Sequence, residues 1–255
     1  MHPIKDIKLI KDLLAEDPIA HLNTIGRIKN SENVEIYVDD HQKPRGFVLK
    51  DGYWAIPYSK DEEILSQILN NFAFPDYVGF CGLPMAWANK IKESLTEYEL
   101  DWDEHCQLYY LPEENIEKIS LVEVLPSLTI EDIDIVDYHY TYKEEGSREY
   151  LLECIQKRPS SVIIEEGKPV SWALVREDNS MGVMYTIEEY RKKGLAKKIT
   201  GDLVRKVVER GNIPYVHIVV TNEASKNLAR ELGLVYWGDV LWFGLKKKGM
   251  ITKEE

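Results

Sequence analysis

The stretch Gly182-Val-Met-Tyr-Thr-Ile187, followed by Glu188-Glu-Tyr-Arg-Lys-Lys-Gly194 and Leu195-Ala196, decides the fold of this 255-residue chain. The first six residues are rich in β-branched and aromatic side chains, which predicts a strand. After the loop, apolar residues recur on one face at helical spacing, at positions 195, 199, 203, 204, 207 and 208. We therefore expect the chain to pass from a strand, through a basic loop, directly into an amphipathic helix.

The turn between this strand and this helix has the features of an anion site. The first N–H groups of a helix have no acceptor within the helix, and with the helix dipole they attract phosphate oxygens. Gly194 would let a ligand approach the backbone closely, and Ala196 keeps the next contact small. Positive charge surrounds the loop at Lys192, Lys193, Lys197 and Lys198. The pattern predicts a phosphate-binding loop; the alternative is a solvated basic helix start whose glycine only shapes the turn.

Outward from this stretch, the second half of the chain alternates between strands and helices. A helix over about residues 148–157 should stop before Pro159, because proline cannot continue it. The other expected elements are strands at 161–165, 170–175 and 215–220, a helix over 222–232, and two short final strands at 234–236 and 240–243. We expect a Gly238-Asp239 turn between those last two strands.

The first half resembles a faded copy of the second. Strand-like runs near positions 34, 44 and 53 repeat the runs near 161, 170 and 182, and Gly46 matches Ser171 at an offset of 125 residues. Further along, Pro75 matches Pro214 at an offset of 139, so the first half lacks a counterpart of the basic loop. We predict an α+β fold in α/β/α layers, built of tandem mixed-sheet halves, residues 1–125 and 126–255, of which the N-terminal half is degenerate.

Composition and charge exclude several classes of protein. Hydrophobic residues make up 44% and charged residues 30%, which is typical of a globular chain. We expect neither a membrane span nor a leader, and three widely spaced cysteines favour reduced thiols in the cytoplasm and no metal site. The net charge of −12 argues against a nucleic-acid partner. Residues 186–255 nevertheless carry a net +5, which suits a small polyanionic ligand.

The segment Arg191-x-x-Gly194-x-Ala196 resembles the pyrophosphate loop of the GNAT (GCN5-related N-acetyltransferase) superfamily. Residues 137–245 are more narrowly similar to the glycine N-acyltransferase family. That similarity rests on Cys154-Ile-Gln-Lys-Arg-Pro159, Pro169-Val-Ser-Trp172, Glu189-Tyr-Arg191 with Gly194-Leu195, and His217 followed by Asn222-Glu-Ala224. The first half resembles that family only in outline.

The resemblance implies an acyl-CoA site, with acetyl-CoA or another acyl-CoA as co-substrate. The strand before the loop should splay from its neighbour and pair with the pantetheine arm. Residues implied to contact the co-substrate are Met184, Tyr185, Thr186, Arg191, Lys192, Lys193, Gly194, Leu195, Ala196, Lys197, Asn222 and Ser225. The strand should also offer an N–H to the thioester carbonyl, the role of an oxyanion hole. Asn222 has the alternative role of a helix N-cap only.

Acyl transfer to an amine requires the neutral amine, whereas a free α-amine titrates at about 8. His217 is the candidate base, since an unperturbed imidazole suits proton removal near neutrality; alternatively it is a hydrogen-bonded core residue. Tyr185 is the candidate acid for the thiolate, against plain packing. Two positions depart from the resemblance: Ala229 stands where many relatives have a tyrosine acid, and Ser180 stands where the family's glutamate is expected, near Glu177 and Asp178.

The predicted function is transfer of an acyl group, most simply acetyl, from acyl-CoA to a primary amine of a small molecule or amino acid, by direct attack in a ternary complex. One alternative is a non-catalytic module that binds acyl-CoA and signals through a partner. Another is acylation of a protein N-terminus or lysine. The sequence leaves open the acceptor, the acyl chain length and whether the chain forms a homodimer.

Overall fold

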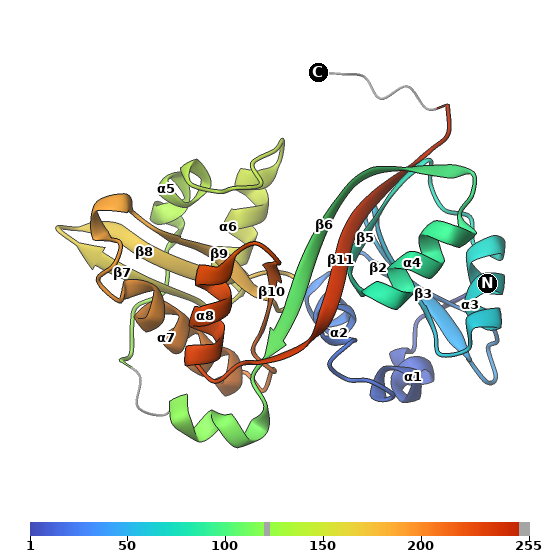
Figure 1. Ribbon diagram of the computed structural model, residues 1–255, viewed down its shortest axis with the longest axis horizontal. Coiled ribbons are helices and arrows are strands. Elements are labelled where there is room, and N and C mark those ends of the chain that lie inside the picture. Colours follow the sequence, from blue (N-terminus) through green and yellow to red (C-terminus); the bar gives the residue numbers. More distant parts are fainter. Residues whose placement is uncertain (120–122, 250–255) are drawn as a thin grey trace. The chain divides into compact units, whose positions relative to one another are not determined.

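The computed structural model of this chain describes residues 1–119 and 123–249, which divide into two compact units (Figure 1). The first unit comprises residues 1–108 together with the chain from Trp237 onward, and the second comprises Tyr109–Tyr236. The last strand of the sequence thus belongs to the unit that the N-terminal half begins. The predicted boundary at residues 125/126 divides the sequence into two repeats, whereas the compact units divide the chain near residues 108 and 236. The boundary between the repeats therefore remains a prediction.

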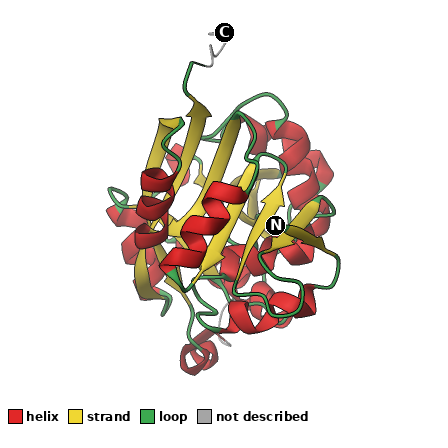
Figure 2. Ribbon diagram, turned by 90° about the vertical axis from the view of Figure 1, so that its right-hand side faces the viewer, coloured by secondary structure: helices red, strands yellow, loops and turns green. Residues whose placement is uncertain are grey.

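The first unit is a mixed sheet with helices packed against it; Figure 2 shows helices in front of the strands. Its strands follow the order β1 (His2–Ile4), β2 (Val34–Val38), β3 (Gly46–Asp51), β4 (Trp54–Ser59), β5 (Tyr77–Pro84), β11 (Val235–Lys247) and β6 (Tyr98–Tyr110). Its helices are α1 (Lys11–Ala15), α2 (Leu22–Asn30), α3 (Glu62–Asn71) and α4 (Met85–Ser94). Phe243 of β11 is fully buried and stacks on Phe80 of β5, with ring centroids 4.7 Å apart.

The second unit has helices on both faces of an antiparallel sheet, as the α/β/α prediction requires. The sheet consists of β7 (Ser160–Glu165), β8 (Lys168–Val175) and β9 (Met181–Thr186). Trp172 and Leu174 of β8 pack in a core with α5 (Ile133–Tyr138) and α6 (Ser147–Lys157). Ala173 and Val175 face the opposite way, into a core with α7 (Leu195–Glu209) and α8 (Glu223–Glu231). Alternation along a strand explains this division, since successive side chains point to opposite faces.

The strand before the loop splays from its neighbour, as the resemblance implies. β9 is the edge strand of the three-stranded sheet, whereas β10 (Tyr215–Val219) is hydrogen-bonded to β6 in the other sheet. β9 and β10 meet near one end, where the Tyr215 hydroxyl donates to the carbonyl of Asp178, just before β9. The strands then separate toward the loop, which leaves the outer edge of β9 without a strand partner in the described part of the chain.

The two halves repeat the same order of elements, which confirms the predicted tandem fold. Three antiparallel strands are followed by a helix, a strand, a helix and a long strand in both halves. Only two residues, 60 and 61, separate β4 from α3, whereas residues 187–194 separate β9 from α7. In the first half, β4 also pairs in parallel with β5, through Trp54 opposite Gly79. The N-terminal half therefore lacks both the long loop and the open strand edge, so it is degenerate as predicted.

The prediction of two short final strands is wrong, because β11 runs without a break from Val235 to Lys247. The residues assigned to a turn lie inside this strand. The Asp239 carboxylate accepts a hydrogen bond from Gln107 at 3.2 Å and lies 3.3 Å from His105 Nε2, both on β6. Asp239 was predicted to lie in a turn because it is polar and follows a glycine. Within the strand, its carboxylate is instead paired with these two side chains of β6.

Candidate functional site

The loop between β9 and α7 exposes backbone donors, because two of its residues are left-handed. Lys192 has a φ of 62° and Gly194, the N-cap of α7, has a φ of 75°. The first bond of the helix runs from Lys198 N–H to the Gly194 carbonyl, so the preceding N–H groups point out of the helix end. No heavy atom lies within 4 Å of the position of a Gly194 side chain. Backbone N–H groups grouped in this way form a concave site for anions.

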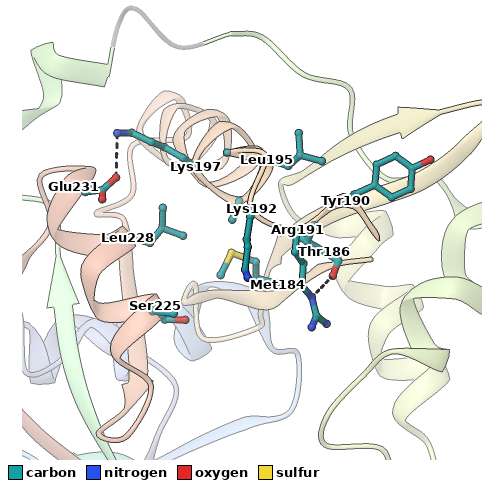
Figure 3. Close-up of a pocket in the computed structure, with 13 residues that line it drawn as sticks. Met184, Thr186, Tyr190, Arg191, Lys192, Leu195, Lys197, Ser225, Leu228 and Glu231 are labelled. Carbon is teal, nitrogen blue, oxygen red and sulfur yellow. Dashed lines mark hydrogen bonds and ion pairs between the residues drawn. The ribbon is translucent and has the colours of Figure 1, made fainter. Parts of the chain in front are cut away.

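A pocket of about 340 Å³ opens in front of this helix end (Figure 3). That volume lies within the range of small-molecule sites. Its wall comes from β9, the loop, α7 and α8, and comprises Met184, Thr186, Tyr190, Arg191, Lys192, Gly194, Leu195, Ala196, Lys197, Ala224, Ser225, Leu228 and Glu231. Nine of these were predicted from the sequence: Met184, Thr186, Arg191, Lys192, Gly194, Leu195, Ala196, Lys197 and Ser225.

The remaining predicted residues do not line this pocket. Lys193 turns to the Tyr190 ring, 4.7 Å from its centroid. Asn222 caps α8, since its side chain accepts from Ser225 N–H at 3.0 Å. Tyr185 lies on the other face of β9, stacked on His139 with centroids 4.2 Å apart. His217 lies on β10, 5.5 Å from the Tyr215 ring. Their proposed contacts with a co-substrate and their catalytic roles remain predictions.

The charges in the wall are only partly positive. Arg191 is held to the strand, with Nε donating to the Thr186 carbonyl at 3.0 Å, and Lys192 is exposed beside it (Figure 3). Lys197 forms an ion pair with Glu231 of α8 at 3.1 Å, drawn as a dashed line in Figure 3. This carboxylate was missed by the sequence analysis. The signal was present, because Ala224, Leu228 and Glu231 share one helix face at spacings of four and three.

A β-bulge deforms β9 next to the pocket. Trp172 of β8 pairs with Tyr185 and Leu174 pairs with Gly182, so Val183 and Met184 together oppose one residue. Val183 has a φ of 48°, a conformation that costs a β-branched residue about 1–3 kcal/mol. Bulges of this kind re-aim side chains and backbone groups near functional sites. Here the bulge includes Met184, which lines the pocket.

The side chain of His217 faces away from the pocket. Val216 and Ile218 pack into the core with α7, so His217 and Tyr215 point to the opposite face of β10. Burial and the positive charge of Arg176 lower the His217 pKa to about 3. The imidazole is therefore neutral at pH 7 and accepts a proton only weakly.

The two departures from the resemblance have structural explanations. Ala229 is 5% exposed, packed in the α7 core, so it offers no hydroxyl to a leaving group. Ser180 is buried in the turn before β9, and its hydroxyl donates to Asp178 Oδ1 at 2.6 Å. Neither residue supplies the acid or the base that the resemblance implies at that position.

Across the described residues, no group of three or more histidine, cysteine or acidic side chains is arranged to hold a metal. No helix of the described chain has the length and apolar character needed to cross a membrane. Cys81, Cys106 and Cys154 are buried free thiols.

Comparison with known proteins finds similarity in the second half. Residues 163–242 match the family model described as FR47-like protein. Glycine N-acyltransferase-like protein 1 of Homo sapiens is 32% identical over 95 residues, which is 36% of this chain and 30% of that protein. The chain thus matches less than a third of that relative's length.

Solved structures show the same fold over nearly the whole chain. A Drosophila protein of 18% identity superposes with a TM-score of 0.77, covering 96% of this chain and 97% of that one. A tandem GNAT protein from the clavulanic acid biosynthesis pathway has a TM-score of 0.57 at 12% identity, covering 98% and 99%. At these identities the likeness shows the fold alone. The resemblance to the GNAT superfamily, and of the second half to glycine N-acyltransferases, is confirmed.

Proposed function

Because the chain has a tandem GNAT fold and a second half similar to glycine N-acyltransferases, we propose that it transfers an acyl group from acyl-CoA to a primary amine. The acyl group is acetyl or another small one, and the acceptor is a small molecule or amino acid. The buried free thiols support a reducing compartment, the cytoplasm.

One observation carries this proposal: the loop pocket is continuous with the edge of β9 that has no strand partner in the described part of the chain. Met184 and Thr186 of that strand line the same pocket as Lys192, Gly194 and the first residues of α7. A diphosphate would bind the helix end, and the amide-bearing arm behind it would hydrogen-bond the edge of β9 as a further strand does. An acyl-CoA has both of these parts in this order.

The chemistry is attack of the neutral amine nitrogen on the thioester carbon. The new C–N bond forms, the C–S bond breaks, and CoA leaves with a proton on sulfur. Backbone N–H groups near the bulge of β9 would stabilise the oxyanion. The amine proton passes to His217, directly or through water, and Tyr185 is the proposed proton donor to sulfur; water then carries the proton from His217 back to Tyr185. With a pKa of about 3, His217 is a weak base, so a water relay to solvent takes part.

A second candidate function is favoured by the buried Ala229. Without a tyrosine there, the site would bind acyl-CoA and report its presence to a partner without turnover. Measuring thiol release from acetyl-CoA with a panel of amines and amino acids separates the two functions. Tight CoA binding without release with any acceptor would support the sensor and contradict the enzyme.

The variant Gly194→Glu tests the pocket itself. Glutamate at this φ of 75° places a negative side chain in the pocket, and we expect CoA affinity to fall by at least about tenfold in calorimetry. Gly146→Glu is the matched control, since Gly146 is also a left-handed N-cap in open space, on α6 of the same unit. Both variants share the conformational cost, so unchanged CoA binding by Gly194→Glu would contradict the proposal.

A further inference from the structure

The half-buried side chain of Arg176, which follows β8, has no hydrogen-bond partner among the described residues. Its Nε is buried, and among the described residues its guanidinium makes no hydrogen bond or ion pair. The buried arginines Arg27 and Arg158 differ. Arg27 donates to Asn23 and Asp51, and Arg158 donates through its terminal nitrogens to Cys154 and Glu153, although its Nε is also without a partner in the described chain. A buried polar group left without a partner costs about 1–3 kcal/mol, and more when it is charged. Such a group in a native structure calls for a partner from outside the chain.

The guanidinium lies on the face of the sheet opposite the loop pocket. Its charge acts on His217, which points to that face of β10. Gly182 of β9 makes room for it, since a side chain there would come within 2.9 Å of Arg176 Nε. Gly182 lies two residues before Met184, which lines the pocket, so an arm bound along the edge of β9 would place its reactive end near Arg176.

The acidic groups next to Arg176 in the sequence accept no hydrogen bond from its guanidinium within the described chain. Glu177 accepts a hydrogen bond from the Tyr150 hydroxyl at 2.6 Å. Asp178 accepts from Ser180 through Oδ1, while its buried Oδ2 has no hydrogen-bond partner among the described residues. These carboxylates offset the charge of Arg176 at a distance without accepting its N–H groups. An incoming acid group would therefore find the planar donor fork open for bidentate binding.

We propose that Arg176 binds the carboxylate of the acceptor, so that the enzyme selects amines that bear an acid group. This inference rests on the proposed acyl transfer and names the specificity-determining residue of that site. A carboxylate bound to Arg176 also offsets the positive charge that lowers the pKa of His217. Binding of the substrate amine would therefore make His217 a stronger base.

Matched acceptors test the assignment. We expect acetyl-CoA turnover with glycine to exceed that with glycinamide by at least about tenfold in kcat/KM. The neutral fraction of the amine does not produce this preference, because glycinamide is the weaker base and more of it is neutral. In Arg176→Gln the preference should fall to about one, and Arg176→Lys should keep part of it, since lysine retains the charge without the fork. Arg158→Gln, at a buried arginine whose two terminal nitrogens donate to Cys154 and Glu153, is the control and should keep the preference.

A binding measurement distinguishes failure of this inference from failure of the proposed function. N-acetylglycine and N-acetylglycinamide are titrated by calorimetry into wild-type protein, Arg176→Gln and Gly182→Ala, with folding checked by circular dichroism. Preference for the acid that is lost in both variants supports the assignment even if no acceptor is turned over, in which case only the transferase proposal fails. Equal binding and turnover of acid and amide by wild type, or a preference that survives Arg176→Gln, would overturn it.

Discussion

At the residue scale, the pocket contains an acidic group that opposes the anion it is proposed to bind. Glu231 and Lys197 are both more than half exposed and form an ion pair across the wall from α8 to α7. Exposed pairs of this kind contribute about 0–1 kcal/mol to stability. The pair should affect anion affinity more than it affects stability. It holds Lys197 away from a bound diphosphate, and it leaves the negative charge of Glu231 in the pocket wall.

Glu231→Gln should therefore raise CoA affinity by about two- to fivefold at low ionic strength, with the gain shrinking as salt is added. Isothermal titration calorimetry at two salt concentrations measures this. Glu209→Gln, an exposed glutamate at the far end of α7 paired with Arg205, is the control and should leave affinity unchanged. A weaker or salt-independent effect of Glu231→Gln would contradict the placement of the diphosphate.

His21 is a second residue whose environment has a measurable consequence. It is fully buried among aromatic rings, 4.4 Å from Tyr58 between centroids, and neither ring nitrogen has a partner within the described chain. Burial lowers its pKa from 6.5 to about 4, with Glu16 opposing the shift. Because the folded pKa is the lower one, the unfolded chain binds the proton first as the pH falls.

The free energy of unfolding should thus decrease between pH 6.5 and 4 by up to about 3 kcal/mol through His21. Urea titrations of wild type and His21→Leu over this range isolate the contribution, since His217 and the carboxylates titrate in both. The difference between the two proteins should change with pH, whereas His41→Gln, at an exposed histidine, should follow wild type. Parallel pH profiles for wild type and His21→Leu would show that the shift is absent.

At the element scale, the long strands decide which residues fold together. β11 pairs with β5 from Val240–Pro84 to Lys246–Tyr77, and buries Leu241, Phe243 and Leu245 in the core of the first unit. The end of β6 contributes Tyr109 to the core of the second unit. Each half of the sequence therefore completes a unit that the other half begins.

A chain that ends at residue 236 should fail to form the first unit, since it exposes the β5 edge and loses three buried core residues. We expect loss of cooperative unfolding for that unit by circular dichroism, and recovery when a peptide of residues 235–249 is added. As a control, a chain ending at residue 249 should unfold as the full chain does. Cooperative unfolding of the 1–236 chain equal to that of the full chain would show that β11 is dispensable.

At the scale of the whole molecule, the two halves differ at the strand edge that forms the candidate site. This edge is open in the second half and paired in the first. In the first half β4 pairs with β5, and a side chain at Gly79 would come within 2.7 Å of the Trp54 and Tyr53 rings. No arm could enter there. In the second half the equivalent strands separate, and eight residues between β9 and α7 leave room for the basic loop. The same order of elements thus yields one open and one closed sheet.

The sequence alone determined the order of elements, the repeat and the loop residues. These depend on local spacing: apolar residues at one helix face, a glycine at a left-handed helix N-cap, and a basic run before it. Six of the nine predicted pocket residues lie in the loop and the start of the helix, whereas Met184, Thr186 and Ser225 came from the resemblance to the GNAT superfamily.

Only the tertiary structure decided the exchange of β6 and β11, the ion pair of Lys197 with Glu231, and the surroundings of Arg176 and His217. Each depends on contacts between residues far apart in the chain, and a strand pattern is the same whichever neighbour it pairs with. An arginine likewise has the same letter in the sequence whether its donors are satisfied or open. Packing decides whether the donors of an arginine have protein partners, because burial removes the water that would otherwise accept their hydrogen bonds.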